Sequence, residues 1–107
     1  MSNEKKSVGK KMADAADDAG TAVKNAASDV KKGAKNAAAD AENKTTKAAN
    51  DAKAKGGNIF DKAGAKVKNT VSDVKTSSKK AANEAESESK KAANNLTNEA
   101  RKSERRN

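Results

Sequence analysis

The chain has 107 residues, with 24 Lys and Arg against 15 Asp and Glu, a net charge of +9, and no His, Cys, Trp, Tyr or Pro. Leu, Ile, Val and Phe together number nine, and Ala supplies most of the other apolar residues, so we expect no globular core and a chain that is disordered in dilute water. Because His, Cys and Tyr are absent and no core can hold a nucleophile beside a base, the composition argues against an enzyme, a cofactor or a defined metal site.

Residues 1–7 are predicted to form a disordered N-terminal tail. They have neither the apolar stretch of a secretion signal nor the Arg-rich pattern of a mitochondrial presequence, and the chain has no apolar run of 18 residues. A cytoplasmic location is therefore expected, without a signal peptide or transmembrane segment. The nucleus is an alternative because residues 101–106 read RKSERR.

Residues 8–104 form an eleven-residue repeat without gaps, whose positions we letter a to k from Val8. Column a is apolar in all nine repeats, and columns e, h and i are mostly small or apolar. Eleven residues complete three helical turns at about 3.67 residues per turn, so these four columns share an arc of roughly 100° on one α-helix. This apolar face is expected to meet another helix, a lipid or a partner. Its larger residues are Val8, Met12, Val23, Val30, Ile59, Phe60, Val67, Val71, Val74 and Leu96.

The polar columns of the repeat are ordered as well. Column k is acidic in six of nine repeats, column g is mostly Asn or Lys, and column f is basic in six. The basic column consists of Lys24, Lys35, Lys68, Lys79, Lys90 and Arg101. The pattern predicts an all-α fold when the chain is ordered, namely one long amphipathic helix of eleven-residue repeats.

The stretch KGGNIF at residues 55–60 contains the chain's only Gly pair. Two adjacent glycines each cost about 1 kcal/mol relative to Ala in a helix, which predicts a break or hinge at residues 55–58, near Gly56-Gly57. Gly56 nevertheless falls in column e, and Ile59 and Phe60 fall in columns h and i. We therefore interpret KGGNIF as one repeat rather than an inserted linker. Residues 105–107 are predicted to be a C-terminal tail.

Residues 12–55, MADAADDAGTAVKNAASDVKKGAKNAAADAENKTTKAANDAKAK, resemble the group 3 late embryogenesis abundant (LEA) proteins, which carry a tandem eleven-residue motif of Ala, Lys and acidic residues. The similar pattern extends over residues 8–104. The resemblance implies a desiccation or stress protectant, disordered in water and helical on drying, that shields nonspecific client proteins and membranes. We also expect the helices to self-associate on drying through the apolar face. The Asn-rich column g, the scarcity of Gln and the positive charge depart from the family pattern.

Two alternatives stay open. The first is an amphipathic helix that binds anionic membrane or lipid surfaces, because residues 58–75 combine five large apolar residues of the apolar face with four lysines. These lysines are Lys62, Lys66, Lys68 and Lys75. The second is a lysine-rich, histone-like nucleic-acid binder. It has weaker support, because interleaved Asp and Glu repel phosphates and a single Phe offers no stacking platform.

Overall fold

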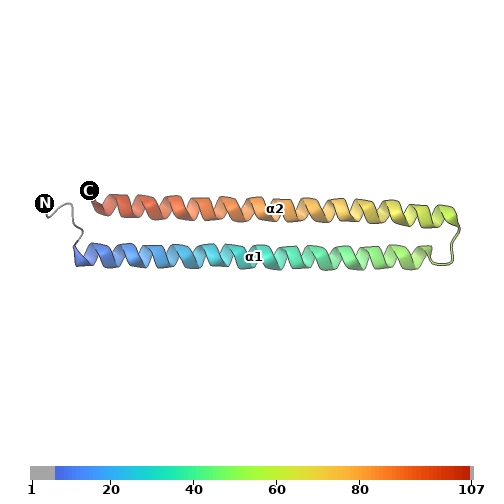
Figure 1. Cartoon of the computed structure of the whole chain (residues 1–107), viewed down its shortest axis with the longest axis horizontal. Helices are drawn as coiled ribbons and strands as arrows, with labels where there is room; N and C mark the ends of the chain where they lie inside the picture. The colour runs from blue at the N-terminus through green and yellow to red at the C-terminus, as the bar shows by residue number, and fades with distance from the viewer. Residues whose placement is uncertain (1–6, 107) are drawn as a thin grey trace. The chain divides into compact units, whose positions relative to one another are not determined.

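The computed structural model describes residues 7–106, so most of the predicted N-terminal tail and Asn107 lie outside the described residues. Two α-helices form the chain, α1 at Val8–Ala54 and α2 at Ile59–Arg106 (Figure 1). The described residues contain no strand, and the predicted all-α ordered form is confirmed. Helix α1 begins where the repeat begins, and α2 continues two residues into the predicted C-terminal tail.

Both helices begin at a capping side chain. The Ser7 hydroxyl accepts a hydrogen bond from the backbone N–H of Lys10 (3.1 Å). At the start of α2, Asn58 Oδ1 accepts hydrogen bonds from the N–H groups of Phe60 and Asp61 (both 3.0 Å), and Asp61 Oδ2 accepts one from the N–H of Asn58 (3.2 Å). These bonds satisfy backbone donors that have no partner within the first turn of a helix.

Residues 55–58 connect the two helices. Gly56 has a φ of +82°, a left-handed conformation that often terminates a helix and that glycine adopts without steric cost. The break predicted at the Gly pair is therefore present. KGGNIF keeps the phase of the repeat, but its first four residues lie outside both helices, because the Gly56 conformation and the Asn58 cap end one helix and start the next. Ile59 and Phe60 are helical, as expected.

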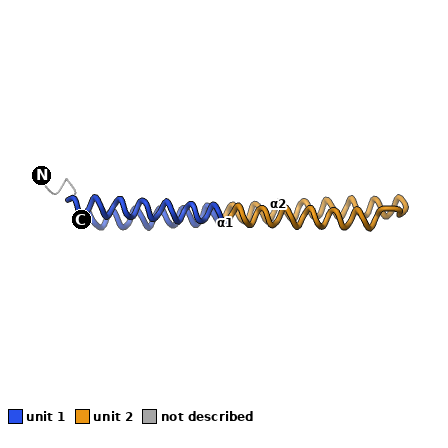
Figure 2. Tube along the Cα trace, turned by 90° about the horizontal axis from the view of Figure 1, so that it is seen from below, with its two compact units in different colours: residues 1–31, 86–107 blue, residues 32–85 orange. Residues whose placement is uncertain are grey.

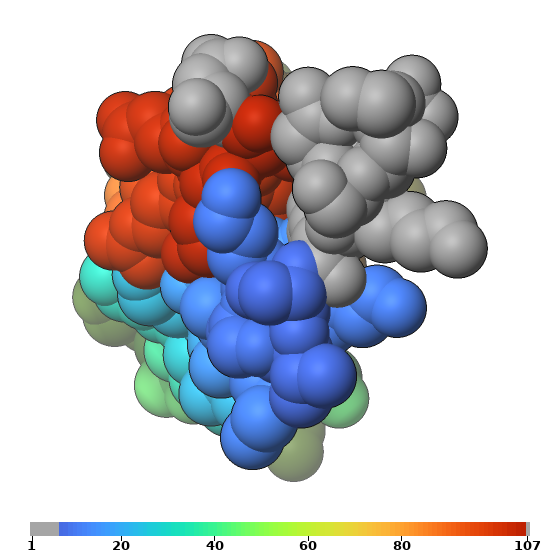
Figure 3. All heavy atoms as spheres, turned by 90° about the vertical axis from the view of Figure 1, so that its left-hand side faces the viewer, coloured from blue at the N-terminus to red at the C-terminus, as the bar shows by residue number. Residues whose placement is uncertain are grey.

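The chain divides into two compact units, each of which pairs part of α1 with part of α2 (Figure 2). Unit 1 is Met1–Lys31 with Glu86–Asn107, and unit 2 is Lys32–Ala85. Within each unit the two helical segments run antiparallel. Figure 3 shows the end of unit 1, where the start of α1 (blue) lies against the end of α2 (red).

Very little apolar surface is buried in either unit. The buried residues are Ala39, Ala54, Ala65, Asp14, Thr76 and Ser87. In contrast, all ten large residues of the predicted apolar face are between 48% and 80% exposed. Among the described residues, the contact between helices is therefore made by small and polar side chains rather than by an apolar core.

Candidate functional site

Helices α1 and α2 contact each other through columns c, g and j of the repeat. In residues 14–54 and 65–105, every residue of these three columns is buried or half-buried. We call this surface the polar seam. Columns c, g and j follow one another at spacings of four, three and four residues. Columns a, e and h have the same spacings, and each lies two positions before the corresponding column of the seam. Two positions rotate about 200° around a helix, so the polar seam lies opposite the apolar face.

Asparagine pairs cross the polar seam in both units. Each pair joins column g of one helix to column j of the other, with 3.0 Å between the amide nitrogen and the amide oxygen. The pairs are Asn94 with Asn25 in unit 1, and Asn83 with Asn36 and Asn50 with Asn69 in unit 2. An amide both donates and accepts hydrogen bonds, so asparagine can pair with asparagine on the neighbouring helix.

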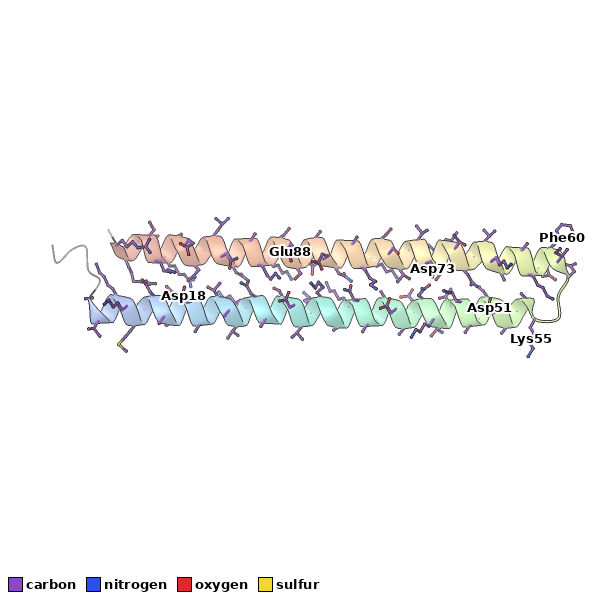
Figure 4. The ribbon with its side chains drawn as sticks, in the orientation of Figure 1. Asp18, Asp51, Lys55, Phe60, Asp73 and Glu88 are labelled. Carbon is purple, nitrogen blue, oxygen red and sulfur yellow. The ribbon has the colours of Figure 1, made fainter. Side chains whose placement is uncertain are left out.

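Acidic residues of column k form ion pairs with lysines of column g on the other helix. The Nζ–Oδ distances are 3.1 to 3.3 Å. Unit 1 contains Lys91 with Asp29 and Lys102 with Asp18, and unit 2 contains Lys80 with Asp40 and Lys47 with Asp73. Figure 4 shows Asp18 and Asp73 directed toward the opposite helix. The regular recurrence of lysine in column g and of acidic residues in column k therefore produces a regular series of ion pairs between the helices.

At the end of unit 1, Arg105 forms a pair of charge-assisted contacts with α1. Its Nε donates to Asp14 Oδ1 at 2.8 Å, and its Nη2 donates to Asp17 Oδ2. Asp14 is the only carboxylate classed as buried among the described residues. Contacts of one guanidinium with two carboxylates restrict geometry more than a single lysine contact does.

The seam contacts shift the pKa values of their charged groups. Hydrogen bonds from Asn43 and Lys47 lower the pKa of Asp73 below its usual range. The pKa of Lys91 is raised by its hydrogen bonds to Asp29 and then Glu88. A hydrogen bond to Asp18 raises the pKa of Lys102. Each shift favours the charged form of the group, as expected for a group beside an opposite charge.

The basic column lies at the margin of the polar seam. Lys79 pairs with Glu42 of α1 (3.2 Å), Lys90 with Glu86 of its own helix (3.7 Å), and Arg101 with Asp17 (3.9 Å). In unit 2 the column also borders shallow grooves between the helices: one of about 350 Å³ is lined in part by Lys68, Lys79, Val67 and Val71, and one of about 310 Å³ by Lys35 and Lys79. Lys24 lies in unit 1, exposed on α1.

The predicted apolar face points away from the neighbouring helix within each unit. Every described residue of columns a, e, h and i is exposed. On α1 these include Val8, Met12, Val23 and Val30, and on α2 Ile59, Phe60, Val67, Val71, Val74 and Leu96. Phe60 is 80% exposed and projects away from α1 beside the connection (Figure 4).

The helices within each unit therefore do not pair through the apolar face, and the expectation that this face meets another helix, a lipid or a partner stays a prediction. The helices instead use the face on which Asn, Asp and Lys find partners. Sequence reasoning missed the polar seam because it assigned contact between helices to the apolar columns and gave the ordered polar columns no pairing role. The signal was present in column g, mostly Asn or Lys, and in column k, mostly acidic, which recur with the same period as the apolar columns.

In residues 7–106, no group of three or more acidic side chains is placed to hold a metal ion, and neither helix carries an apolar stretch long enough to cross a membrane. Comparisons with protein-family models, with curated proteins and with solved structures find no match.

Proposed function

We propose that the chain is a LEA-like desiccation or stress protectant, disordered when hydrated and helical on drying. The observation that carries the proposal is the exposure of the whole apolar face, which leaves Ala39, Ala54 and Ala65 as the buried apolar residues in the part of the chain that the structure describes. Burial of a methyl group contributes about 0.8 kcal/mol, whereas fixing the backbone of one residue costs roughly 1–2 kcal/mol. Hydrophobic burial within the units is therefore too small to hold the helices in water.

The polar seam supports a dependence on water. A hydrogen bond between protein groups contributes only about 0.5–1.5 kcal/mol in water, because water competes for the same donors and acceptors. Exposed ion pairs contribute about 0–1 kcal/mol. When water is removed, backbone and seam groups must find partners within the protein. Drying is thus expected to favour the helices and the seam together.

The exposed surface fits a protectant that acts without a specific pocket. Exposed charged and amide side chains occur along both helices, and they can replace water around client proteins and lipid headgroups as drying proceeds. In the hydrated state, the disordered chain would separate denaturing client molecules. The proposed partners are accordingly nonspecific client proteins, and the proposed location remains the cytoplasm.

The test is circular dichroism of the purified chain in buffer, after drying and after rehydration, together with recovery of a labile enzyme dried in its presence. We expect a disordered spectrum in buffer, a helical spectrum after drying and a disordered spectrum again after rehydration. The enzyme dried with the chain should recover more activity than the enzyme dried alone. A cooperative thermal unfolding transition in buffer would contradict the proposal, because it would show a fold stabilised in water.

A second candidate function is binding to anionic membrane surfaces. The observation in its favour is the cluster at the start of α2, where Ile59 and Phe60 are 77% and 80% exposed. Val67, Val71 and Val74 continue the same face. Exposed apolar residues next to lysines allow shallow insertion combined with attraction to acidic headgroups.

A further inference from the structure

The repeat keeps its phase across residues 55–58, although these residues lie outside both helices. Ala54 and Ala65 both occupy column c, and Asn50 and Asp61 both occupy column j. A connection between antiparallel helices does not require this, since loops of different lengths can return the chain. A continuous helix does require it, because each added residue rotates the following face by about 100°. The pairing of helices within the units therefore does not explain why the repeat continues in phase across residues 55–58.

The connection is short and depends on its two glycines. Gly56 has a φ of +82°, and a Cβ atom added to Gly57 would lie 2.5 Å from Asp61 Oδ2 and 2.8 Å from Asp61 Cβ. Both positions therefore disfavour any larger residue while the connection is present. If residues 55–58 became helical, α1 and α2 would join into one helix, and alanine at the same two positions would then be favoured.

In such a joined helix, the polar seam would continue along one face without a partner from its own chain. The partners that it needs are supplied by a second copy that runs antiparallel. Column g would again meet column j, as Asn36 meets Asn83, and column k would meet column g, as Asp40 meets Lys80. The charges select this direction. The ion-paired carboxylates of α1 (Asp18, Asp29 and Asp40) face lysines of α2, whereas a parallel pair would place the α1 carboxylates beside one another.

We propose that the chain has a second helical state, in which residues 55–58 are helical and the polar seam binds a second copy of the chain in an antiparallel homodimer. The rise in protein concentration on drying favours this state by mass action. The proposal does not depend on the protectant role, because it follows from the phase of the repeat, the glycine connection and the contacts across the seam.

The test compares two double variants that raise helix propensity equally. Gly56→Ala/Gly57→Ala acts on the connection. The matched control is Gly20→Ala/Gly33→Ala within α1, where an added Cβ meets no atom within 4 Å. Each substitution favours a helix by about fivefold, and a dimer contains four of them, so the connection variant should raise the dimerisation constant by roughly several hundredfold. The control should leave the ratio of dimer to monomer unchanged.

The readout uses the absence of cysteine from the sequence, which allows a single spin label in each chain. One batch carries Ala15→Cys and the other Ser103→Cys, both at exposed positions of unit 1. The labelled batches are mixed and frozen in concentrated osmolyte, at a concentration where circular dichroism shows helix. Dipolar coupling between the two batches reports residue 15 of one copy beside residue 103 of another. We expect this signal to increase in the connection variant alone. Equal signals in the connection and control variants, or none in either, would overturn the proposal.

A third variant tests the phase directly. Two serines inserted between residues 57 and 58 of the connection variant lengthen a loop at little cost, but in a joined helix they rotate the second half of the seam by about 200°. We expect the coupling between batches to disappear, while a chain labelled at both positions retains its internal coupling. A signal between batches that survives the insertion would show that the dimer uses another surface, and the inference would be wrong.

Discussion

Phe60 is the largest apolar side chain of the protein and, at 80%, the most exposed of the large apolar residues that the structure describes. If it inserts into anionic bilayers, Phe60→Ala removes an anchor that contributes about 1.5–3 kcal/mol when fully buried. Vesicle binding should then weaken by roughly tenfold or more. Flotation of wild type and variant with anionic vesicles, at low and moderate salt, measures the effect.

Leu96→Ala provides the matched control for Phe60. Leu96 is 72% exposed on the same face of α2, but it lies outside the lysine-rich segment 58–75, and its removal should change vesicle binding little. Equal binding by all three proteins, lost together as salt rises, would reject insertion and leave surface electrostatics.

Asn58 is the second residue whose role can be isolated, because its side chain caps α2. Its Oδ1 accepts two backbone hydrogen bonds at 3.0 Å, and loss of such a cap costs about 1 kcal/mol. Asn58→Ala should therefore require more trifluoroethanol to reach the same helix content, as measured by circular dichroism. Asn58→Ser retains a capping oxygen and should titrate like wild type; identical curves for all three chains would show that the cap contributes nothing.

At the scale of the helices, the polar seam predicts a pH window. Because the pKa of Asp73 is lowered, its stabilising effect is present at neutral pH and is lost as pH falls below about 4. Because the pKa values of Lys91 and Lys102 are raised, their contribution is present below about pH 10 and is lost as pH rises further. Helix content at fixed osmolyte should therefore be constant near neutrality and should fall in strong acid and strong alkali.

Two lysine variants separate the seam from general charge effects. Lys91→Gln removes a seam ammonium and should reduce the alkaline loss of helix. Lys68→Gln removes an ammonium that has no hydrogen-bond or ion-pair partner among the described residues, and it should leave the alkaline limb unchanged. Identical alkaline limbs for both variants would mean that the ion pairs across the seam do not stabilise the helices.

The sequence alone was sufficient to predict the helices but not the way in which they pair. The repeat begins at Val8 and α1 does too, and the Gly pair marks the break, because helical period and glycine conformation are local properties. The pairing face is not local. It depends on whether Asn25 can reach Asn94 across 69 positions, and a hydrophobicity pattern ranks Asn, Lys and Asp as residues that face water. Alanine in the apolar columns gives too little burial to decide the pairing against these polar contacts.

At the scale of the whole molecule, protection by spacing should depend on composition more than on order. A chain with the same residues in scrambled order should therefore retain much of the recovery of a labile enzyme after drying and rehydration. The experiment compares the two chains at equal mass, with the enzyme alone as the baseline. Complete loss of protection in the scrambled chain would assign the effect to a defined helical face instead.

The repeating seam also leaves the alignment of the helices weakly determined. If α2 moved along α1 by one repeat, Asp29 would face Lys102 instead of Lys91, and Asp40 would face Lys91 instead of Lys80, so the ion pairs would re-form with lysines of the same column. Arg105 breaks this equivalence, because after the same shift it would leave its two aspartates for uncharged residues. The alignment of two helices built almost entirely from interchangeable repeats would then be determined within unit 1, by the guanidinium of Arg105 next to the buried carboxylate of Asp14.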